Sequence, residues 1–154
     1  MADIEIVRAI HVVAVILWIG GVGFVTMCLL PYCRAELPPA EAVSTFEAME
    51  RRFATLARLF ILAAGLSGGW MVWRYHIWDR FGDLTFWWMD AMAGVWLVFF
   101  LVVFVAEPLF LHRVFATRAA RDPAGTLLRA WRLHLVLLNA SLITAFGAVM
   151  GVHG

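Results

Sequence analysis

Lysine is absent from this 154-residue chain, and charged residues make up only 15% of it. A soluble domain usually carries about 25% charged residues. Hydrophobic residues reach 64%, which leaves too little polar surface to cover the folded chain in water. The net charge is +1 and no compact basic patch is present, so we expect no nucleic-acid partner. The composition indicates that the partner of this chain is a lipid bilayer.

Cysteine is also scarce. Cys28 and Cys33 are the two cysteines, and they lack the spacing of a metal site. The haem-attachment pattern C-x-x-C-H is missing, which excludes a covalent c-type haem. No phosphate-binding loop, dinucleotide fingerprint or Ser/His/Asp constellation is present, so we set aside hydrolytic and nucleotide chemistry.

Long hydrophobic runs take the place of these features. A helix needs about 20 mostly apolar residues to cross a bilayer, and barrel strands would alternate in polarity, which these runs do not. We predict an all-α fold, a single membrane domain built as a four-transmembrane-helix bundle. The first run is too long, and residues 1–8 too acidic, for a cleaved signal peptide. The predicted spans are approximately 6–31, 54–76, 85–112 and 130–152.

The arginines predict an orientation. Four spans put both termini and the loop near residues 75–86 on one side, with three arginines, and nine arginines on the other. Because positive residues favour the cytoplasm, we predict periplasmic N- and C-termini in a bacterial inner membrane.

The second helix is predicted to extend into the cytoplasm. Ser44 and Glu47 match a capping box that would begin it. Glu47, Glu50, Arg51 and Arg52 would then form a solvated face.

One face of the first helix carries a histidine and small residues. Helical spacing aligns His11, Ala14, Trp18, Gly21 and Val25. In one interpretation His11 is an axial ligand of haem iron, with space for the macrocycle beside Trp18 and Gly21. In the other, this is a helix-packing face with an interfacial histidine.

Candidate partners of His11 lie at the same predicted depth. Met89 and Met92 are potential ligands of haem or copper, because a thioether binds both. We expect Asp90 to face the bundle and to pair with Arg74, Arg80 or His11, since a charge at membrane depth needs a partner.

A second polar group is predicted at the cytoplasmic side. His112 would end the third helix and His134 would begin the fourth, so the two could bind one haem. Arg113, Arg129 or Arg132 would then lie near its propionates. The alternative is that both histidines are simply interfacial.

The first helix resembles that of the CopD and HemJ group of small bacterial membrane proteins. The resemblance lies in Arg8-x-x-His11, then Leu17-Trp18-Ile19-Gly20-Gly21 and Leu30-Pro31, and extends to Gly65-Leu66-x-x-Gly69. CopD proteins are associated with copper handling, and HemJ is a haem-binding protoporphyrinogen oxidase. The resemblance implies a functional His11.

The third helix departs from the HemJ pattern, which places a lysine soon after a Trp/His pair. Here the stretch reads Trp87-Trp88-Met89-Asp90-Ala91-Met92, without lysine. The resemblance therefore does not imply oxidase activity. A methionine there could complete a His/Met haem site with His11, which would raise the reduction potential above that of a bis-His site.

Three functions follow as hypotheses. The first is a b-type haem protein for electron transfer or redox chemistry, a membrane oxidoreductase or a subunit of one, with non-covalent haem b. The second is a cofactor-free structural or accessory subunit. The third is a copper-handling protein that uses His11, Met71, Met89 and Met92. Homo-oligomers or other membrane redox subunits are the expected protein partners.

Overall fold

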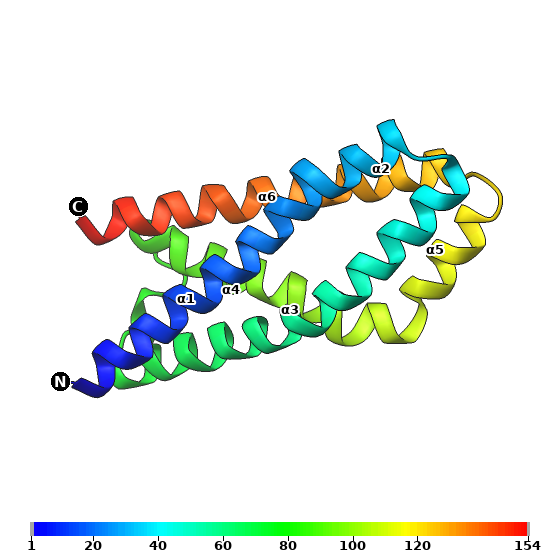
Figure 1. Ribbon diagram of the computed structural model, residues 1–154. Coiled ribbons are helices and arrows are strands. Elements are labelled where there is room, and N and C mark those ends of the chain that lie inside the picture. The colour runs from blue at the N-terminus through cyan, green and yellow to red at the C-terminus, as the bar shows by residue number, and fades with distance from the viewer. Residues whose placement is uncertain (1, 154) are drawn as a thin grey trace.

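The computed structural model describes residues 2–153, with side chains for residues 3–151, and this part of the chain is built from helices without strands. Four helical stretches are long and apolar enough to cross a membrane, which confirms the predicted all-α, membrane-compatible architecture. Figure 1 shows both termini and the loop after α3 at one end of the bundle, the terminal end, and two short turns at the other, the turn end.

The first stretch is continuous and contains a π-helical segment. It runs from α1 (Ala2–Phe24) through a π-helical segment, η1 (Val25–Leu29), into α2 (Leu30–Glu36). The Leu30 N–H bonds to the Val25 carbonyl five residues earlier, which is the π-helical pattern. Pro31 follows immediately and has no N–H to restore the α-helical bond.

The second stretch, α3 (Pro39–Tyr75), has 37 residues and is therefore about 55 Å long. Its start differs from the prediction. The helix begins at Pro39, and Ser44 lies inside it, donating its hydroxyl to the Glu41 carbonyl. The capping box was wrong because proline suits the first helical position, where no N–H is needed.

A loop with two 3-10 turns, η2 (Trp78–Arg80) and η3 (Leu84–Phe86), leads to the third stretch. That stretch contains α4 (Trp87–Phe100), a long π-helical segment η4 (Leu101–Leu111) and α5 (His112–Ala119). After a turn, α6 (Pro123–His153) returns to the terminal end.

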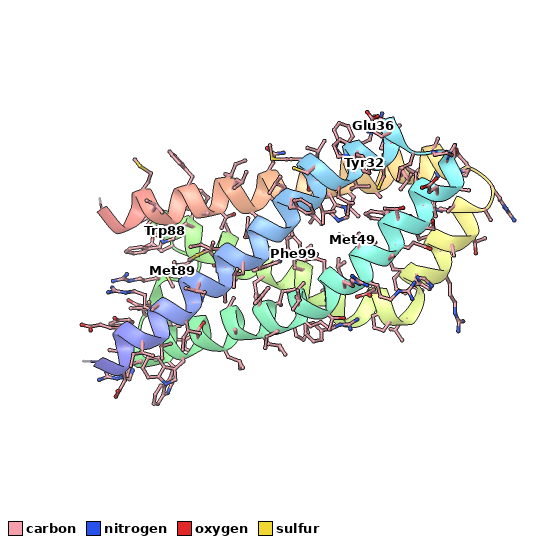
Figure 2. All side chains as sticks on the ribbon, in the orientation of Figure 1. Tyr32, Glu36, Met49, Trp88, Met89 and Phe99 are labelled. Atoms are coloured by element: carbon pink, nitrogen blue, oxygen red, sulfur yellow. The ribbon has the colours of Figure 1, made fainter. Side chains whose placement is uncertain are left out.

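Two helical hairpins make the bundle. α1 packs against α3, and α4 packs against α6. The core near the middle contains Trp18 and Phe99, whose rings meet edge to face at 4.9 Å between centroids. A second core at the turn end surrounds Leu30, Cys33 and Phe46. Figure 2 shows Met89 near the terminal end and Met49 and Glu36 toward the turn end, with Phe99 between them.

Candidate functional site

The face of α1 that carries His11 is a packing surface against α3. Ala14 and Trp18 are buried, and a Cβ added to Gly21 would overlap the Phe53 ring of α3. The Phe53 ring thus occupies the space beside Gly21 where a macrocycle was predicted. Of the two interpretations of this face, the structure supports helix packing.

His11 itself joins α1 to α3. Its Nδ1 lies 2.9 Å from the Ala64 carbonyl and 3.1 Å from the Ser67 hydroxyl, while Cε1 lies against Gly68. Because a carbonyl only accepts, Nδ1 carries the proton and donates to Ala64. The lone pair is left on Nε2. His11 is therefore satisfied as a structural residue, although Nε2 is available as a ligand.

The predicted partners of His11 have other surroundings. Met89 is buried and Met92 is partly buried, and no hydrogen bond or ion pair joins either of them to His11 among the described residues. Asp90 is exposed rather than facing the bundle, and its Oδ2 accepts the Gly82 N–H at 3.1 Å. Its predicted pairing with Arg74, Arg80 or His11 is not formed among the described side chains. The Asp90 carboxylate instead stabilises the loop between α3 and α4. Arg74 is exposed.

His112 and His134, which form the other predicted group, line the same cavity. This cavity of about 590 Å³, the turn-end cavity, opens between the hairpins and extends from Trp18 and Phe99 toward the turn end. Its apolar walls come mainly from α1, α3, α4 and η4, and include Trp18, Val22, Phe53, Phe99, Val102 and Val103.

The polar lining contains three acidic and three basic residues, and some of them were predicted to face solvent. Glu47 and Glu50 are partly buried and line the cavity, contrary to the predicted solvated face. The reason is that the first turns of α3 still pack against α5, with Phe46 and Phe115 in contact. Arg52 is exposed, as predicted. The charged lining residues are Glu47, Glu50, Glu107, Arg51, Arg118 and Arg129.

His134 is held in one orientation. Its Nδ1 lies 2.9 Å from the Ala130 carbonyl one turn earlier, and its ring meets Phe46 edge to face at 6.2 Å. As for His11, the carbonyl partner makes Nδ1 the donor and leaves the Nε2 lone pair free. Histidines that bind a metal through one ring nitrogen commonly donate the N–H of the other nitrogen to a carbonyl, as His134 does here.

Two further groups lie at the cavity: Trp18, which the sequence predicted for a pocket beside His11, and Glu107, which was not predicted as a site residue. Trp18 Nε1 is buried and has no hydrogen-bond partner among the described residues. Glu107 accepts a hydrogen bond from Arg58 at 3.0 Å, so an ion pair joins α3 to η4 beside the cavity. The sequence signal for Glu107 was a carboxylate next to Pro108 inside an apolar helix, a costly position that suggests a role.

Of the three arginines predicted near the propionates, Arg129 lines the cavity, whereas Arg113 and Arg132 are exposed and do not. The described residues contain no cluster of three or more His, Cys, Asp or Glu side chains that could hold a metal ion. A metal at the cavity would therefore depend on one or two histidines.

Comparison with known proteins adds no relative to this geometry. No family model matches the chain, and no match was found among curated proteins or solved structures.

Proposed function

We propose that this chain is an integral membrane b-type haem protein whose haem binds in the turn-end cavity. The observation that carries the proposal is a single hollow of about 590 Å³ lined by both His112 and His134. Cofactor sites typically enclose about 300–1,000 Å³. The proposed haem site therefore lies at the turn end of the bundle and not at His11.

His134 is the residue that we expect to hold the haem iron. Its Nδ1–H is engaged by the Ala130 carbonyl, so Nε2 is the atom that would bind iron. Phe46 limits rotation of the ring. His112 begins α5, which packs against α6, and it is exposed; it would be the second histidine to hold the group.

The rest of the lining fits an amphiphilic macrocycle. Arg51, Arg118 and Arg129 are available to pair with propionates, because guanidinium binds carboxylate through paired hydrogen bonds. Aromatic and branched side chains line the inner part of the cavity. There the unpartnered Trp18 N–H would gain an acceptor in the occupant, including the face of a π-system.

Haem with histidine ligands supplies one-electron transfer, at a potential tuned by ligands, hydrogen bonds and burial. The protein residues would orient the group and exclude water from its inner edge. Electron transfer or a coupled redox reaction is therefore the proposed function, and the activity would be that of a membrane oxidoreductase or of one of its subunits.

The test is an absorption spectrum of the detergent-purified protein, with pyridine haemochrome and metal analysis. We expect a Soret band and about one haem b per chain. His134→Ala should abolish or strongly reduce the band, while His11→Ala should leave it in place. The two variants are matched, because each removes a histidine whose Nδ1 bonds to a carbonyl.

Other outcomes would overturn the proposal. Copper without haem would support copper handling, and neither group would support an accessory subunit. A band lost in His11→Ala and kept in His134→Ala would place the haem at the terminal end, as the sequence first suggested.

A further inference from the structure

The outer surface of α6 carries one polar residue at the depth of the bilayer. Residues 133–151 of α6 are uncharged, and Asn139 lies near the middle of the helix with an exposed side chain. Ser141 and Thr144 of the same stretch are buried, and each donates its hydroxyl to a carbonyl one turn earlier. Asn139 is thus the polar residue that α6 presents outward within this stretch.

Its hydrogen bonds are incomplete. Among the described residues, Asn139 makes one side-chain hydrogen bond, from Nδ2 to the Leu135 carbonyl at 2.7 Å. A primary amide has a second N–H and a carbonyl oxygen with two lone pairs. Lipid tails supply no partner for these groups, so leaving them in hydrocarbon is costly.

The neighbours of Asn139 form a regular seam. Val136, Ile143, Phe146 and Met150 are 61% to 70% exposed. Together with Asn139 they are spaced by three and four residues in alternation, which is the spacing of helices that pack with a left-handed crossing. An apolar seam alone gives no preference for protein over lipid, so Asn139 is the residue that distinguishes this surface.

We propose that α6 forms a two-fold symmetric homodimer seam in which Asn139 pairs with Asn139 of a second copy. The amide contains both a donor and an acceptor, so it complements itself across a two-fold axis without any other polar residue. A different subunit would have to present its own amide or hydroxyl at this depth. A single buried asparagine also sets the register of paired helices.

The seam lies on the outer surface of α6 and does not involve the turn-end cavity, so the dimer and the haem proposal stand or fall separately. The first experiment measures the mass of the protein–detergent complex and the association of labelled copies in lipid vesicles. We expect a dimer for the wild type. Asn139→Leu should weaken association roughly 5- to 30-fold, the effect of one or two kcal/mol.

Two controls make the result specific. Asn139→Gln keeps the amide and should retain the dimer, and Ser141→Ala removes a buried hydroxyl of the same helix without affecting association. Helix content by circular dichroism shows whether each variant is folded. A monomeric wild type, or a dimer that is unchanged in Asn139→Leu, would overturn the proposal.

A second experiment locates the seam. In a Cys28→Ser background, Ile143→Cys should form a disulfide between copies in native membranes. Ile16→Cys, equally exposed but on α1, should not. Crosslinking at Ile16 in place of Ile143 would show that a different face is the interface.

Discussion

At the residue scale, the bundle is joined by rings placed over glycines. A Cβ at Gly21, Gly65, Gly147 or Gly151 would overlap an aromatic ring of a neighbouring helix. Trp96 covers Gly65 and also donates its Nε1–H to the Ile61 carbonyl at 2.8 Å. In lipid no hydrophobic force drives helices together, so their association depends on close packing. The glycines allow that close packing.

Adjacent glycines of α1 provide a matched test of this packing. Gly21→Ala should destabilise the protein by about 1–3 kcal/mol, because the added methyl group overlaps the Phe53 ring. Gly20→Ala should stabilise the protein by about 0.5–1 kcal/mol, because no atom lies within 4 Å of the added Cβ and alanine favours the helix. Thermal unfolding in detergent, followed by circular dichroism, measures both variants. Equal shifts of the two midpoints would contradict the packing assigned to Gly21.

The sequence indicated the residues of this contact but not its partner. The spacing of His11, Trp18 and Gly21 predicts one face of a helix, and the structure confirms that they share an interface. The ring that packs on Gly21 is that of Phe53, 32 positions away. The helical periodicity of the sequence contains no information about which residue of another helix packs there. For the same reason the unpartnered Trp18 N–H and the inward position of Glu50 could not be predicted.

At the element scale, the four helices and the extension of α3 before its apolar span were predictable, but the exact ends of the helices were not. Hydropathy finds only the part of each helix that matches the bilayer, so α3 begins 15 residues before the predicted span at residue 54. The π-helical segment η4 has no hydropathy signal. Pro108 lies inside it, and the missing N–H frees a carbonyl that can then bond five residues ahead.

The ion pair between Arg58 and Glu107 joins α3 to this irregular segment. Arg58→Met and Glu107→Gln should each destabilise the protein. Either change leaves the charge of the other residue of the pair without its partner. The double variant should lose less than the sum of the two, with a coupling of about 0.5–3 kcal/mol. A double-mutant cycle on chemical unfolding in detergent gives this number. Additive losses would show that the pair does not stabilise the contact.

At the scale of the whole molecule, the arrangement of the termini permits a prediction of orientation. Both termini lie at one end of the bundle, and the two short turns lie at the other. Of the twelve arginines, Arg8, Arg74 and Arg80 belong to the terminal end, Arg58 lies near the middle of α3, and the other eight lie toward the turn end. This asymmetry favours a cytoplasmic turn end, and the turn-end cavity would then open toward the cytoplasmic side.

Reporter fusions in a bacterial host test the orientation. Alkaline phosphatase fused at the C-terminus should be active, because it folds in the periplasm, whereas the same reporter inserted in the turn at residues 120–122 should be inactive. A green fluorescent reporter at the two positions should give the opposite pattern. Reversed activities would place the termini in the cytoplasm.

The division into two hairpins has a consequence for biogenesis. α1 and α3 are synthesised before α4 and α6, and each pair of helices has its own close contacts. The walls of the turn-end cavity come from both pairs, so the cavity does not exist until the second pair has docked on the first. Any prosthetic group would therefore enter a fully inserted chain, and loading would be the last step of maturation rather than a template for membrane insertion.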